Sequence, residues 1–131
     1  MTPQANALGL VVADLAVAID FYSRLGLEFG EPEHGHAEAK LAPGFRLMLD
    51  SEASIQSFTS GWTRASGGPR SALAFQVDSP ADVDHIFGVL MEAGYKGERG
   101  PWDAPWGQRY ASVIDPDGNG VDLYAQLPAA P

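Results

Sequence analysis

The sequence has no cysteine, so it can form no disulfide and offers no thiolate as a nucleophile or metal ligand. Basic residues are also scarce: 8 Lys and Arg stand against 17 Asp and Glu, which gives a formal net charge of −9. A nucleic-acid surface needs clustered Lys and Arg, so we expect no nucleic-acid partner. The acidic balance weakly favours a neutral or cationic ligand.

Long hydrophobic runs are missing as well. No apolar run reaches the roughly 20 residues that a membrane-spanning helix requires, so we expect no membrane partner. The opening MTPQAN lacks the basic start and apolar stretch of a secretion signal, and the expected location is cytoplasmic. The length of 131 residues suits one domain, or two small modules that share a core.

What the sequence does contain is an internal repeat. Residues 7–27 (ALGLVVADLAVAIDFYSRLGL) align with residues 72–95 (ALAFQVDSPADVDHIFGVLMEAGY). Each copy reads as a short apolar strand, then a helix that starts at Asp14 or at Asp78-Ser79-Pro80 and ends at a glycine. A duplicated strand–helix unit predicts two similar halves with a groove between them.

Further strands are expected after each repeat. They form two hairpins, residues 35–41 with 45–50 and residues 109–114 with 120–125. Tight turns at 42–44 and 115–119 join their strands. Residues 51–70 and the segment 97–107 (GERGPWDAPWG) are rich in Gly, Pro or Ser, and we expect both to be irregular.

Three segments carry a resemblance to a known family: VVADLAVAIDFYSRLGL, VDSPADVDHIFGVLMEAG and WGQRYASVIDPDGNGVDLYA. They resemble the vicinal oxygen chelate superfamily of glyoxalase I, fosfomycin-modifying enzymes, extradiol dioxygenases and bleomycin-resistance proteins. The resemblance implies an α+β fold with two βαβββ modules in tandem. Their strands would form a curled, bowl-shaped mixed sheet with helices on its outer face, usually in a homodimer.

The same resemblance implies one vicinal oxygen chelate domain over residues 1–131. Module 1 would span about 5–55, a linker about 56–70, and module 2 about 71–127. The superfamily hosts many chemistries, so the fold alone does not choose a function.

The metalloenzymes of the family place one metal ligand at each of four strand positions. The resemblance maps these positions onto Ala7, Met48, Ala72 and Asp122. Alanine has no donor atom, a thioether is a poor ligand for hard divalent ions, and one carboxylate falls short of three or four ligands. We therefore expect no metal and no other cofactor at this site.

No catalytic residue stands out either. His34, His36 and His85 read as solvated surface residues, with adventitious metal binding by the first two as the alternative. Asp122 could act as a lone general base if burial raised its pKa, or could be a hydrogen-bonded carboxylate with no catalytic role.

Strand alternation gives the two sheet faces different characters. The face of the four ligand positions carries small residues near its centre: Ala7, Gly9, Ala72, Ala74 and Gly120. The opposite face carries large apolar side chains, against which the helices should pack. Since protein interiors are densely filled, small residues leave room for a ligand or for loop aromatics that fold in.

We expect eight residues to contact such a ligand: Arg46, Met48, Trp62, Trp102, Trp106, Tyr110, Asp122 and Tyr124. Bleomycin-resistance relatives stack planar drug rings on loop aromatics, and Trp102 and Trp106 lie in a comparable loop. Packing on the core or on a dimer interface is the alternative for each Trp. Arg109 is expected to support this loop rather than bind ligand.

The leading hypothesis is a metal-independent binding protein that sequesters a bulky aromatic natural product or antibiotic, in a cytoplasmic homodimer. An enzyme is the second hypothesis, either a glyoxalase-type lyase or isomerase or a dioxygenase-like metalloenzyme with ligands elsewhere. The third is a structural or regulatory protein whose bowl is closed by Trp102 or Trp106.

Overall fold

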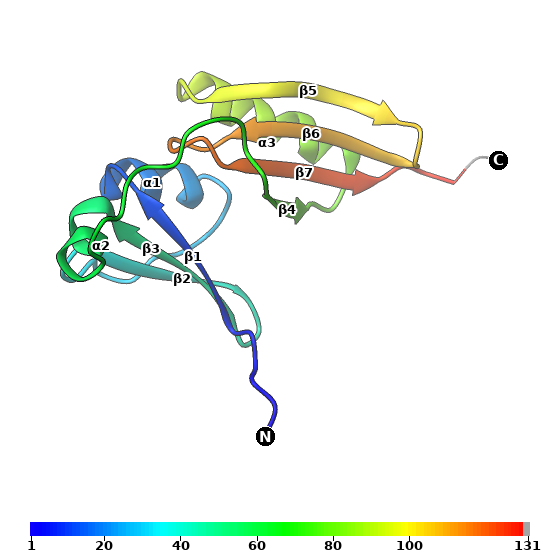
Figure 1. The fold of residues 1–131 in the computed structure, drawn as a ribbon. Coiled ribbons are helices and arrows are strands. Elements are labelled where there is room, and N and C mark those ends of the chain that lie inside the picture. Colours follow the sequence, from blue (N-terminus) through cyan, green and yellow to red (C-terminus); the bar gives the residue numbers. More distant parts are fainter. Residues whose placement is uncertain (130–131) are drawn as a thin grey trace. The chain divides into compact units, whose positions relative to one another are not determined.

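The computed structural model describes residues 1–129. The chain divides into two compact units, and the boundary between them along the chain lies between Ser66 and Gly67. Each unit has its own small open sheet with a helix against it (Figure 1). The expected α+β fold with tandem modules is thus confirmed. None of the helices within residues 1–129 combines the length and the hydropathy needed to cross a membrane.

Unit 1 contains a three-stranded sheet. Its elements are β1 (Ala7–Val12), α1 (Leu15–Ser23), β2 (His36–Ala42), β3 (Phe45–Ser51) and α2 (Glu52–Phe58). The strand order is β1-β3-β2, with β1 parallel and β2 antiparallel to β3.

Unit 2 contains a four-stranded sheet. Its elements are β4 (Ala72–Gln76), α3 (Pro80–Glu92), β5 (Lys96–Ala104), β6 (Gln108–Ile114) and β7 (Gly120–Gln126). The strand order is β4-β7-β6-β5, with β4 parallel to β7 and the other pairs antiparallel. Helix α3 lies along one face of this sheet (Figure 1).

The two units repeat one another in strand register. Ala7 pairs with Arg46 in unit 1, and their repeat equivalents Ala72 and Gly120 pair in unit 2. Over the described residues, the units differ in that unit 2 has no counterpart of α2 and unit 1 has no counterpart of β5. In that region a single bridge between Phe29 and Ala39 stands where unit 2 has a full strand. Unit 1 is therefore βαββ followed by α2, whereas unit 2 is the expected βαβββ.

Both long helices begin as the sequence predicts. The side chain of Asp14 accepts a hydrogen bond from the backbone N–H of Val17 at 3.1 Å, which satisfies one of the free donors of the first turn of α1. Ser79 does the same for the N–H of Asp82, with Pro80 at the first helical position of α3.

One face of each sheet is buried by its helix. In unit 1 the buried set is Val12, Ala18, Phe21, Tyr22, Ala37, Ala39, Leu47 and Leu49. In unit 2 it includes Val83, Leu90, Ala111, Val113, Val121 and Leu123. Since neighbouring strand residues alternate between faces, each sheet also presents a second face, here called the open face, that carries none of these buried strand residues. Any site on the sheets must use these open faces.

Two segments that we expected to be irregular are ordered elements. The interpretation of residues 97–107 as a loop was wrong, because most of them form β5. Gly97, Gly100 and Pro101 weakened the strand pattern, yet β5 is an edge strand, where proline and breaks in register are tolerated. Within 51–70, residues 52–58 form α2, in which the backbone N–H of Ser54 donates to the side chain of the N-cap residue Ser51.

Repeat-equivalent core residues allow a stability test of both units. Leu49 and Leu123 are completely buried, and truncation of either to Ala leaves a cavity in its unit. We expect each variant to lose about 2–5 kcal/mol of unfolding free energy in urea denaturation. The control is Phe58→Ala, since Phe58 is 72% exposed and its loss should change stability by less than about 0.5 kcal/mol. A small effect of either Leu variant would contradict the described packing.

Candidate functional site

The open face of unit 2 carries four aromatic side chains in continuous contact, here called the aromatic row. Trp102 meets Trp106 edge to face with ring centroids 5.5 Å apart, and Trp106 meets Tyr110 in the same way at 5.5 Å. Tyr110 and Tyr124 are register partners on β6 and β7 and stack at 6.1 Å. Such ring contacts are favourable beyond simple burial. Trp106 nevertheless remains 58% exposed, so the row presents a broad apolar surface.

Asp122 lies beside this row on β7, and hydroxyl groups of β6 donate to both of its carboxylate oxygens. The Tyr110 hydroxyl donates to Oδ2 at 2.6 Å, and the Ser112 hydroxyl donates to Oδ1 at 2.9 Å. Burial, followed by the hydrogen bond to Asp122, raises the pKa of Tyr110 to about 12. Tyr110 therefore stays a neutral donor near neutral pH, and Asp122 is held in place on the face.

The open face of unit 1 is polar instead and carries a chain of contacts, here called the charged row. Its members are Asn6, His36, Glu38, Arg46 and Asp50. The imidazole of His36 lies 2.6 Å from Asp50 and 2.7 Å from Glu38. The other oxygen of Glu38 lies 3.0 Å from Nε of Arg46, whose guanidinium also donates to Asn6.

The position of His36 selects one charge state. A neutral imidazole has one N–H, so it can donate to only one of two carboxylates, whereas the imidazolium donates to both. The hydrogen bond to Glu38 and then the one to Asp50 raise the pKa of His36 above 6.5. The two ring nitrogens point to different carboxylates, so these three side chains do not converge on a common point. His36 is a partly exposed strand residue, as expected, and it is also paired with Glu38 and Asp50, which the sequence interpretation did not include.

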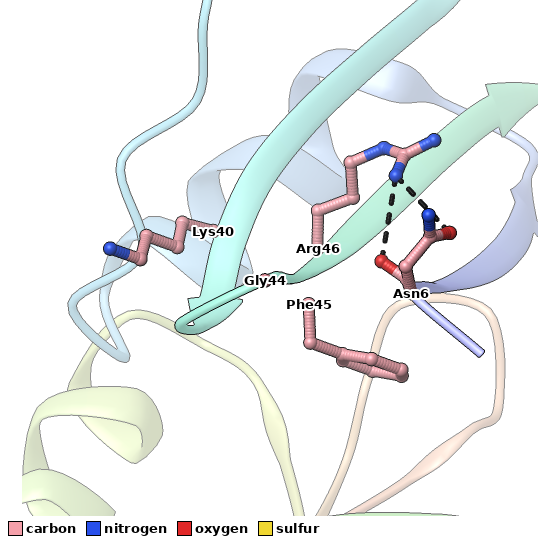
Figure 2. A pocket seen from close by; sticks show the side chains of 5 residues that line it. All are labelled: Asn6, Lys40, Gly44, Phe45 and Arg46. Carbon is pink, nitrogen blue, oxygen red and sulfur yellow. Dashed lines mark hydrogen bonds between the residues drawn. The ribbon is translucent and has the colours of Figure 1, made fainter. Parts of the chain in front are cut away.

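A shallow pocket of about 260 Å³ lies at one end of the charged row. Figure 2 shows Arg46 turned toward Asn6, with Phe45 and Lys40 pointing in other directions around Gly44. The guanidinium of Arg46 already donates a hydrogen bond to Asn6 and pairs with Glu38. Much of its hydrogen-bonding capacity is therefore used within the chain and not directed at a ligand in this pocket.

The four positions at which the resemblance would place metal ligands do not form a donor set. Ala7 and Ala72 have no donor atom, and the thioether of Met48 lies 3.7 Å from the guanidinium of Arg46. Asp122 is the only carboxylate among them, and both its oxygens accept hydroxyl hydrogen bonds. Within residues 1–129, no three His, Asp or Glu side chains are arranged to hold a metal ion. The residues present do not fit the family's metal.

The structure brings most of the predicted ligand residues together in two groups. Trp102, Trp106, Tyr110, Asp122 and Tyr124 share the open face of unit 2. The hairpin predicted for 109–114 and 120–125 is present and regular, and it sets Tyr110 opposite Tyr124 and Ser112 opposite Asp122. Arg46 and Met48 are neighbours on the open face of unit 1. Trp62 follows α2 in unit 1 and is half-buried, with no ring contact among the described residues.

Two further residues have roles that are visible only in three dimensions. Arg109 turns toward α3 and pairs with Asp84 and Asp103 at 3.0 Å each, so it joins α3 to β5 as the expected support. Arg99, which sequence reasoning missed, lies with its guanidinium carbon 3.5 Å from the centroid of the Trp102 ring. The charged row could have been found, because the predicted hairpin already sets His36 opposite Asp50.

A model of the Glyoxalase/Bleomycin resistance protein/Dioxygenase superfamily matches residues 4–123, nearly the whole chain. The chain belongs to this superfamily. The superfamily's name joins glyoxalases and dioxygenases with bleomycin resistance proteins, so membership does not by itself fix one function. No curated protein matches the sequence.

Solved structures of the superfamily share the fold. A glyoxalase/bleomycin resistance protein/dioxygenase from Nocardioides is 26% identical with a TM-score of 0.77, over 99% of this chain and 87% of that one. A glyoxalase-related enzyme from Fulvimarina pelagi is 23% identical, with a TM-score of 0.81 over 95% and 89%. A lactoylglutathione lyase from Agrobacterium tumefaciens is 22% identical, with a TM-score of 0.68 over 95% and 94%.

The charged row predicts a pH-dependent stability. Because the pKa of His36 is raised on folding, its contribution is fully present below pH 6.5 and is lost as the pH rises through the raised value. We expect His36→Asn to lower the unfolding temperature more at pH 5.5 than at pH 9. The control is Phe58→Ala, which removes an exposed side chain with no titratable group and should change the unfolding temperature equally at both pH values. An equal effect of His36→Asn at both pH values would contradict the imidazolium assignment.

Proposed function

We propose that this protein binds a planar aromatic small molecule without a metal, as in the sequestration of a natural-product antibiotic. The observation that carries the proposal is the aromatic row on the open face of unit 2, arranged around Asp122. Four rings in contact form an apolar surface on which a flat ligand can lie against an exposed ring, and Asp122 is a polar group that can orient it. The superfamily includes bleomycin resistance proteins, which makes a drug-like ligand the first class to test.

Exposure of the rings supports binding over simple packing. A Trp that is 58% exposed, and that also contacts two other rings, offers apolar area to a partner at little reorganisation cost. The indole N–H of Trp106 donates to Gln108 at 2.9 Å, which fixes the ring in place. A ligand would therefore meet a preformed surface.

The hydrogen bonds of Asp122 favour binding over catalysis. Each oxygen of Asp122 already accepts from a hydroxyl group, and these two hydrogen bonds stabilise the carboxylate and make it a weaker base toward a substrate proton. Tyr110, whose pKa is raised to about 12, is a poor proton donor to a substrate at neutral pH. Both residues act more readily as fixed hydrogen-bonding groups than as an acid–base pair.

The open face of unit 1 is a second candidate contact surface, since Arg46 and Met48 lie on it and a thioether adapts to irregular apolar shapes. Trp62 remains a candidate contact as well. The homodimer and the cytoplasmic location expected from the sequence belong to the same proposal. Light scattering of the purified protein would decide the oligomeric state.

Calorimetry with planar drugs tests the proposed function. Bleomycin and doxorubicin are titrated into the full chain in the presence of EDTA. We expect at least one to bind with the same affinity with and without EDTA, and Trp106→Ala to weaken binding by about three- to tenfold, because a ring contact is worth roughly 0.5–1.5 kcal/mol.

The control is Phe58→Ala, which removes an exposed ring outside the predicted set and should leave the affinity unchanged. Absence of binding by both drugs would count against the proposal. Stoichiometric Zn, Ni, Fe or Mn in freshly purified protein, with binding or turnover lost in EDTA, would favour the metalloenzyme alternative.

A further inference from the structure

Strand β5 departs from regular pairing on both sides of Arg99. Between Gly97 and Arg99 the strand uses one more residue than its partner segment on β6, and between Arg99 and Trp102 it again uses one more. In a regular strand, residues three apart point to opposite faces. The second bulge instead places both Arg99 and Trp102 opposite residues of the open face, Ser112 and Tyr110. Bulges re-aim side chains in this way and occur frequently beside binding sites.

The result is a guanidinium group placed over the face of an aromatic ring. The guanidinium carbon of Arg99 lies 3.5 Å from the centroid of Trp102, at the end of the aromatic row. Stacking uses the face of the planar group and leaves its N–H edges free to donate. A guanidinium with a fixed plane and free edges matches the two oxygens of a carboxylate.

Within the described part of the chain, Arg99 has no carboxylate partner, and this distinguishes it from four other arginines. Arg24, Arg46, Arg64 and Arg109 each pair with a carboxylate of the chain. Over residues 1–129, no carboxylate lies within ion-pair distance of Arg99, although the protein carries 17 Asp and Glu. The neighbouring Glu98 lines a separate shallow pocket with Lys96. Asp122, the acid of the same face, is occupied by Tyr110 and Ser112.

We propose that Arg99 is an anion subsite of the aromatic face, and that the ligand is an aromatic carboxylate. This local cation outweighs the net charge of −9, which by itself favours a neutral or cationic ligand. The ring of such a ligand lies against the aromatic row while its carboxylate receives N–H hydrogen bonds from the free edge of Arg99. Ser112, the register partner of Arg99, donates its hydroxyl hydrogen bond to Asp122, so this serine does not compete for the carboxylate of the ligand. The inference rests on the proposed function and deepens it by naming the ligand class.

A matched pair of probes tests the subsite. Naphthalene-2-carboxylate and its neutral isostere naphthalene-2-carboxamide present the same ring system with and without the negative charge. Calorimetry on the full chain at low ionic strength should show the carboxylate bound about fivefold or more tightly than the carboxamide, corresponding to an ion pair of roughly 1 kcal/mol. In Arg99→Gln this ratio should fall to about one while the carboxamide affinity stays unchanged.

Two further variants distinguish the effect of arginine's paired N–H donors from the effect of a positive charge alone. Arg99→Lys keeps the charge but loses the planar donor pair, so the ratio should fall to an intermediate value. Lys96→Gln removes the same charge from an exposed position of the same strand, and the ratio should remain that of the wild type.

Other outcomes overturn the inference. Equal binding of the two probes by the wild type, or an unchanged ratio in Arg99→Gln, would refute the anion subsite while leaving aromatic binding intact. Tighter binding of both probes by Arg99→Gln would show that Arg99 competes with the ligand for Trp102. Binding of neither probe by the wild type would count against the proposed function together with the subsite.

Discussion

The parallel pairing of the first and last strands of each unit is the constraint on which the rest of the structure depends. β1 pairs with β3 and β4 pairs with β7 in equivalent register, so each unit aligns its strand faces in the same way. A parallel pair needs a crossover, and here each crossover contains a helix that buries one face of its sheet. The helix takes the large apolar residues, and the opposite face is left for function.

The same scaffold presents different chemistry in its two copies. Unit 1 lines its open face with ionic contacts centred on His36, whereas unit 2 lines its open face with rings centred on Tyr110. Each unit contains two of the four strand positions that the resemblance maps onto metal ligands. These positions are Ala7 and Met48 in unit 1 and Ala72 and Asp122 in unit 2, and together they do not provide a set of metal ligands. The duplicated fold is retained, and the groups that it positions suit recognition better than metal chemistry.

Sequence reasoning predicted the regular parts of this structure because they follow from alternation and capping. The position of Asp122 opposite Ser112 follows from the turn that joins β6 and β7, and α1 follows from Asp14 and its apolar stripe. The missed features break these rules. The strand character of β5 is hidden by Gly97, Gly100 and Pro101, and the place of Arg99 depends on two bulges whose positions no sequence period reveals. The ring contacts of Trp106 arise between residues that are not strand partners.

The central claim is that the aromatic row of unit 2 is a metal-independent binding surface. Indole N–H signals in nuclear magnetic resonance spectra test it most directly, because the chain has three Trp and two of them belong to the row. During titration with a planar aromatic ligand in EDTA, the account predicts that the Trp102 and Trp106 signals move together and saturate. Movement of the Trp62 signal alone, or shifts that EDTA abolishes, would contradict it.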